Sequence, residues 1–117
     1  MFNDITEDMW GELHNVEKRH IEHISQQLDS GKLFSDLCLK YFSDVALSLA
    51  SRSLKEQQNF TIATKLKDIL MQILNSPNKV SIATKEQNKQ LISETLLDLD
   101  YASGSRRTMS LRLMSLK

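Results

Sequence analysis

Residues 5–28 read ITEDMWGELHNVEKRHIEHISQQL, and the spacing of their apolar side chains decides the fold class. Steps of three to five residues return to one face of an α-helix, where a turn takes about 3.6 residues. The stretch therefore predicts one amphipathic helix over about residues 4–29, ended by Ser30-Gly31. The apolar positions that carry this period are Ile5, Met9, Leu13, Val16, Ile21, Ile24 and Leu28.

The same period continues along the chain, which holds only three Gly and one Pro. It predicts further helices over about residues 32–57, 60–74 and 80–101. The run from Phe60 to Leu74 is the most regular, and Pro77 ends it because proline has no backbone donor. The wholly polar stretch from Thr84 to Gln90 predicts an exposed, frayed or looped first half of the last helix, held by Val80, Ile82 and Ala83.

These helices predict an all-α fold. Short connections favour an antiparallel bundle of three or four helices over residues 1–101. Residues 102–117 follow as a basic tail containing Ser and Arg, which is expected to be flexible or docked on the bundle. At 117 residues one domain is the prior expectation.

Bulk charge excludes some classes of partner. Lys and Arg total 15, as do Asp and Glu, so the formal net charge is zero and gives no long-range attraction to nucleic acid. The single cysteine, Cys38, lies between Leu37 and Leu39 and is expected to be a small buried apolar side chain. With no signal sequence or spanning segment evident, the sequence predicts a cytoplasmic protein.

Three histidines fall in the first predicted helix. His20 and His23 share a helix face, and Glu17 lies three residues before His20, so a zinc site is one hypothesis. A di-iron bundle would need a second Glu-x-x-His pair and two more Glu residues, and none is evident. The main prediction is therefore no metal and no cofactor, with a metal-binding protein that uses His20 and His23 kept as an alternative.

No catalytic motif is evident. Three scattered glycines cannot form a phosphate-binding loop. Asp98 and Asp100 are two residues apart, so a helix places them on different faces. The sequence therefore predicts a non-enzymatic protein.

The tail is a candidate contact region. Arg106, Arg107 and Arg112 make it basic, and Ser110 and Ser115 each follow an Arg by three residues, a spacing that basophilic kinases favour. Phosphorylation would cancel local positive charge. Together with Lys117 these arginines make four cations, which would give at most weak contact with an anionic membrane.

Residues 7–55 resemble the opening of F-BAR domains in the BAR superfamily. The likeness is carried by Glu7-Asp8-Met9-Trp10, Asn15-Val16-Glu17-Lys18, Leu28-Asp29-Ser30-Gly31, Asp36-Leu37 and Val45 to Ala50. The resemblance implies a dimeric helical module working at membranes or the actin cortex. Leu49-Ala50 stands where the family usually has Tyr-Ala, and the chain has about half the length of a complete domain of this kind.

Together these observations predict a helical interaction module, an adaptor or scaffold, that buries an apolar helix face against a protein partner. A homo-oligomer is expected, because the second predicted helix is apolar on several sides. A BAR-like membrane scaffold is the second hypothesis. The predicted contact residues are Trp10, Phe34, Phe42, Arg106, Arg107 and Arg112.

Overall fold

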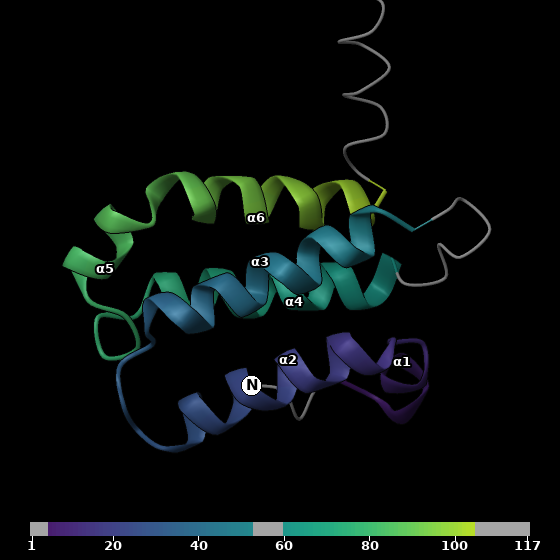
Figure 1. Ribbon diagram of the computed structural model, residues 1–117, viewed down its shortest axis with the longest axis horizontal. Coiled ribbons are helices and arrows are strands. Elements are labelled where there is room, and N and C mark those ends of the chain that lie inside the picture. Colours follow the sequence, from purple (N-terminus) through teal and green to yellow (C-terminus); the bar gives the residue numbers. More distant parts are fainter. Residues whose placement is uncertain (1–4, 53–59, 105–117) are drawn as a thin grey trace, which may run out of the picture.

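The computed structural model describes residues 5–52 and 60–104. These two ranges contain six α-helices and no β-strand. This confirms the predicted all-α class. Within these two ranges, none of the helices has both the length and the apolar character needed to cross a lipid bilayer. The helices are α1 (Glu7–Gly11), α2 (Asn15–Asp29), α3 (Asp36–Ala50), α4 (Phe60–Leu74), α5 (Ile82–Gln87) and α6 (Lys89–Ala102) (Figure 1).

Helix α3 lies between α2 and α6, and α4 runs behind it against α6 (Figure 1). Helices α2 and α3 are antiparallel, as expected for neighbours joined by a short loop. Helices α3 and α6 instead run in the same direction, and Asn88 Nδ2 at the start of α6 donates to Asp36 Oδ1 at the start of α3 (2.7 Å). The arrangement therefore departs from a wholly antiparallel bundle, because α4 carries the chain back to the end of the molecule where α3 begins.

The first predicted helix is broken in two. Helix α1 ends at Gly11 and α2 begins at Asn15, so the expectation of one continuous helix over 4–29 was wrong. The break turns Leu13 into the core, where it is 4% exposed. It also frees the Glu12 carbonyl, which accepts a hydrogen bond from Arg52 Nη1 (3.1 Å). The Glu12 carbonyl thus accepts a hydrogen bond from a residue far along the chain instead of one within a helix. The spacing of apolar residues does not predict such a contact.

The remaining boundaries follow local signals to different degrees. Helix α4 spans the predicted run, and Gly31 adopts φ +74° after α2, as expected of a helix stop. Helix α3 begins at Asp36 rather than at residue 32. Ser35 Oγ caps this start by accepting a hydrogen bond from the backbone N–H of Cys38 (3.3 Å). The predicted last part of this helix, 53–57, falls within residues 53–59, which lie outside the described residues.

The last predicted helix is also divided, at Asn88, which separates the short α5 from α6. Val80 is buried as expected, but Ile82 is 74% exposed and Ala83 is also exposed, so these two residues do not hold α5 down. Lys85 Nζ performs that role by donating to the Leu74 carbonyl at the end of α4 (3.1 Å).

Helices α3 and α4 supply most of the core. Its buried members on α4 follow the predicted 3.6-residue period, and Cys38 on α3 is 4% exposed, which confirms its expected burial. Helix α3 contributes Cys38, Leu39, Phe42, Val45, Ala46 and Leu49, and α4 contributes Ile62, Ala63, Leu66, Ile69, Leu70, Ile73 and Leu74.

Two leucines on α3 give a matched test of this packing. Leu49 is fully buried and Leu47 is 57% exposed. We expect Leu49→Ala to lower the free energy of unfolding by about 2–5 kcal/mol, because it leaves a cavity. Leu47→Ala should change it by about 0.5 kcal/mol or less. Urea denaturation of both variants measures the difference, and equal losses would contradict the described orientation of α3.

Candidate functional site

The predicted contact residues do not gather in one place. Phe34 and Phe42 are each 1% exposed, and their ring centroids lie 6.0 Å apart inside the core. Their prediction as partner contacts is therefore corrected, because a buried ring offers no surface to another protein. Trp10 on α1 is partly buried and packs against the core. The tail residues Arg106, Arg107, Ser110, Arg112 and Ser115 lie outside the described residues.

A buried ion pair joins the start of α2 to the end of α3. The Glu17 side chain is fully buried and pairs with Arg52 Nη2, whose side chain is 5% exposed. The same carboxylate accepts from Ser48 Oγ (2.6 Å) and from the backbone N–H of His14 (2.7 Å). Glu17 is thus surrounded by three donors, which is how a buried carboxylate offsets its loss of hydration.

This pairing removes Glu17 from the metal hypothesis. A zinc site built on His20 and His23 needs further ligands, and the Glu17 carboxylate that the hypothesis used is turned into the core. Across the described residues, no group of three or more His, Cys, Asp or Glu side chains converges in a geometry that would hold a metal ion.

The two histidines instead flank an aromatic ring on the neighbouring helix. The Tyr41 ring centroid lies 5.1 Å from that of His20 and 5.3 Å from that of His23, and the His23 ring is stacked on it. His20 Nδ1 is buried and has no hydrogen-bond partner among the residues that the structure describes. The rings therefore form a small aromatic contact between α2 and α3.

Helical spacing extends this contact into two facing stripes. On α2, Val16, His20 and His23 are separated by four and three residues and so share a face, and on α3 Leu37 and Tyr41 are four apart. Val16 is 51% exposed and Leu37 is 54% exposed. We call these five residues the α2–α3 surface.

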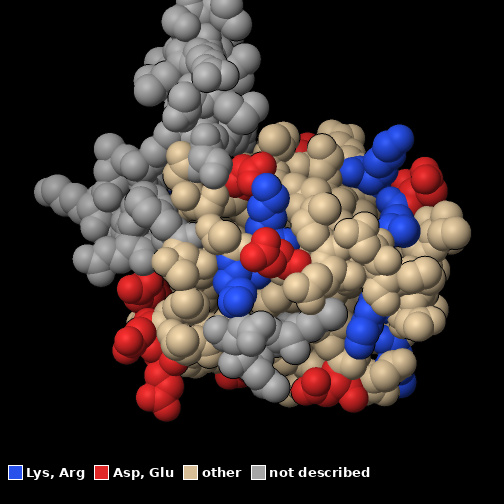
Figure 2. All heavy atoms as spheres, turned by 180° about the vertical axis from the view of Figure 1, so that it is seen from behind, with Lys and Arg blue, Asp and Glu red and all other residues tan. Residues whose placement is uncertain are grey.

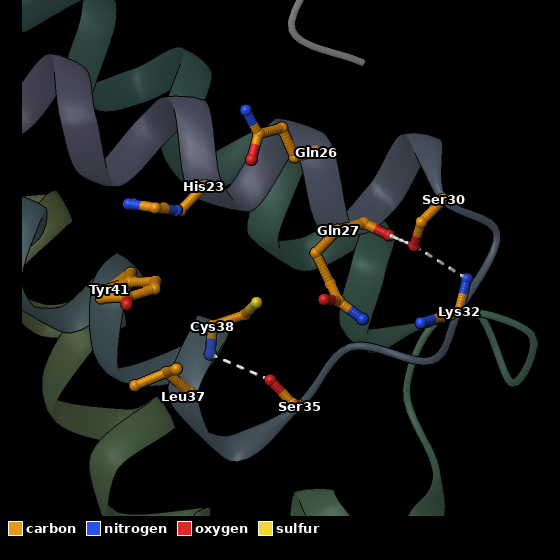
Figure 3. Close-up of a pocket in the computed structure, with 9 residues that line it drawn as sticks. All are labelled: His23, Gln26, Gln27, Ser30, Lys32, Ser35, Leu37, Cys38 and Tyr41. Atoms are coloured by element: carbon orange, nitrogen blue, oxygen red, sulfur yellow. Dashed lines mark hydrogen bonds between the residues drawn. The ribbon is translucent and has the colours of Figure 1, made fainter.

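One end of this surface is hollowed into a pocket of about 260 Å³. Figure 3 shows the Tyr41 and His23 rings at one end of the pocket and Lys32 at the other, with the Gln27 amide and the Cys38 sulfur between them. It lies between the last turns of α2 and the first turns of α3. The lining residues are His23, Gln26, Gln27, Ser30, Lys32, Ser35, Leu37, Cys38 and Tyr41.

The polar wall of the pocket is held by local hydrogen bonds. Gln27 Nε2 donates to the Leu33 carbonyl (2.9 Å), and Ser30 Oγ donates to the Gln27 carbonyl (2.7 Å). The backbone N–H of Lys32 donates to Ser30 Oγ (3.3 Å). These bonds fix the α2–α3 loop, so the pocket is formed by the fold itself and needs no ligand to shape it.

The face seen from behind the view of Figure 1 has a different character. Figure 2 shows Lys and Arg interspersed with Asp and Glu over that face. Mixed charge of this kind is ordinary for a solvated surface. The α2–α3 surface is therefore the better candidate for a binding site.

Sequence reasoning missed the pocket. Gln26, Gln27, Ser30 and Lys32 belong to no motif, and they become neighbours of Tyr41 only when α2 folds back on α3. The spacing of Leu37 and Tyr41 was a usable signal, but the second predicted helix was apolar on so many sides that its free face was not identifiable.

Comparisons with known proteins found no match: no protein-family model, no curated protein and no solved structure matches this chain. The F-BAR resemblance therefore stays a prediction.

The buried ion pair generates a testable prediction. Arg52→Met leaves the Glu17 carboxylate buried without its cation, and we expect a loss of about 3–5 kcal/mol in the free energy of unfolding. The double variant Glu17→Met/Arg52→Met should lose less than the sum of the two single variants by at least about 1 kcal/mol, because it buries no lone charge.

The control is the more exposed pair Lys67–Asp100, whose side chains are 36% and 29% exposed. Lys67→Met should cost less than about 1 kcal/mol. Additive losses at Glu17 and Arg52 in urea denaturation would contradict the pairing.

Proposed function

We propose that this protein is a non-enzymatic interaction module, an adaptor or scaffold, that binds a protein partner through the α2–α3 surface. The observation that carries the proposal is the position of Leu37. It is 54% exposed, and it borders a formed pocket beside Tyr41 and His23.

Contiguity separates this surface from ordinary exposed side chains. Single exposed apolar residues are common on folded proteins and need no explanation. Here Leu37 and Val16 lie at the two ends of a strip whose centre is the contact between Tyr41 and the two histidines. Apolar and aromatic side chains of this kind dominate the energetics of protein interfaces.

Rigidity also supports a binding role. The Glu17–Arg52 pair holds one end of the α2–α3 contact, and the bonded loop around Ser30 holds the other. A surface that is ordered before binding loses less conformational entropy when a partner docks.

The proposal extends to features that come from the sequence. Arg106, Arg107 and Arg112 in the tail add contacts to an acidic partner, and phosphorylation of Ser110 or Ser115 weakens them. The unpaired Cys38 fits a reducing compartment such as the cytoplasm. A second copy of the chain is among the partners that the module binds.

Panning a displayed random-peptide library against the purified protein tests this function. We expect enriched peptides to bind at least about tenfold more weakly to Leu37→Glu, because the variant removes apolar contact and adds a charge that binding would desolvate. Ile82→Glu is the matched control, since Ile82 is 74% exposed on α5 and does not line the pocket.

Circular dichroism should show the same helix content for both variants. The proposal fails if no peptide is enriched, or if Leu37→Glu and Ile82→Glu affect binding equally.

A further inference from the structure

We infer that the α2–α3 pocket selects an acidic peptide segment, with a carboxylate at Lys32 and an adjacent apolar or aromatic side chain against Leu37 and Tyr41. The inference rests on the proposed function, because it names the class of partner for the same surface. It is supported by the charge, the polarity and the size of the pocket.

The charge of the pocket is positive. Lys32 is the one Lys or Arg among the nine lining residues, and none of them is Asp or Glu. Lys32 forms no ion pair with any residue that the structure describes. The acidic residue at the start of α3, Asp36, accepts a hydrogen bond from Asn88. The pocket thus offers an open cation and no carboxylate of its own, which complements a negative group.

The other end of the pocket complements an apolar group. Leu37 is more than half exposed there, and the Tyr41 ring stands stacked with His23 (Figure 3). The cation and the aromatic ring lie at opposite ends of one pocket, so a ligand that uses both must carry a negative group and an apolar group that are separated by the length of the pocket. Adjacent residues of a peptide meet this requirement.

Hydrogen-bonding capacity in the middle of the pocket favours a peptide backbone. Gln27 Nε2 is engaged by the Leu33 carbonyl, which holds the amide in one orientation. The Gln27 Oε1 atom then serves as an acceptor that faces the pocket (Figure 3). A backbone N–H between the acidic and the apolar residue of a bound peptide would satisfy it.

The size of the pocket fits a small anchoring group. The volume of about 260 Å³ falls just below the range of roughly 300–1,000 Å³ in which small-molecule sites usually lie. It accommodates one or two side chains, as an anchor of a larger interface does.

Three synthetic peptide pools test the inference by fluorescence polarisation. They share neutral randomised flanks and carry a central Glu-Phe, Gln-Phe or Glu-Ala. We expect the Glu-Phe pool to bind the full chain about threefold more tightly than Gln-Phe, the size of a partly exposed ion pair. Raising the salt concentration should reduce this preference. Glu-Ala should bind about tenfold more weakly, because the apolar contact is lost.

Variants assign the preference to the pocket. Lys32→Gln should abolish the preference for Glu-Phe over Gln-Phe, and Lys32→Arg should keep it. The matched control is Lys40→Gln, an exposed lysine on α3 that does not line the pocket. It should also keep the preference.

The inference is overturned if no pool binds, if Glu-Phe and Gln-Phe bind equally, or if Lys32→Gln retains the preference. The random-peptide library tests the proposed function separately from the acidic specificity, because its peptides are not restricted in charge. Neutral binders that depend on Leu37 would leave the interaction module standing and remove only the acidic specificity.

Discussion

The structure depends on one buried ion pair, between Glu17 and Arg52. A carboxylate with no exposed surface is costly unless donors surround it, and here the donors come from three places: Arg52 beyond the end of α3, Ser48 on α3 and the backbone of His14. They meet only when α2 lies antiparallel to α3 in a single register. The pair thus favours one arrangement of these helices over others that would bury similar apolar area.

The same pair explains the break between α1 and α2. The Glu17 carboxylate accepts a hydrogen bond from the N–H of His14, and Arg52 donates one to the carbonyl of Glu12. The backbone groups that the break leaves without helical partners are therefore hydrogen-bonded on both sides of it. Leu13 then turns into the core. At the far end of the register, His23 and Gln27 come opposite Tyr41 and Leu37 and form the pocket. The register that the charge pair favours at one end of these two helices thus also brings His23 and Gln27 opposite Tyr41 and Leu37 at the other end.

Features of the fold that depend on sequence neighbours could be predicted from the sequence, and features that depend on distant residues could not. The limits of α4, the Gly31 stop and the burial of Cys38 depend on neighbours in sequence, and spacing predicts them. The break at residues 12–14 and the parallel course of α3 and α6 depend on Arg52 and Asn88, which lie far along the chain. The candidate site mixes both: the apolar stripe is local, but the polar wall has no sequence motif.

The error over Phe34 and Phe42 shows why aromatic residues alone are a poor guide to a binding face. Helix α3 has several apolar sides, and its Phe42 ring lies in the core beside Phe34 from the preceding loop. Both rings bury nearly all of their area there. The face left outside carries Leu37, which is more than half exposed, and Tyr41, which is partly buried against the core and stacks on His23 of α2. Because more than half of the Leu37 side chain is exposed, this position can change with little loss of stability. A docking surface can therefore arise from a helix that has more apolar residues than the core can bury. The positions of the neighbouring helices decide which of these residues stay exposed.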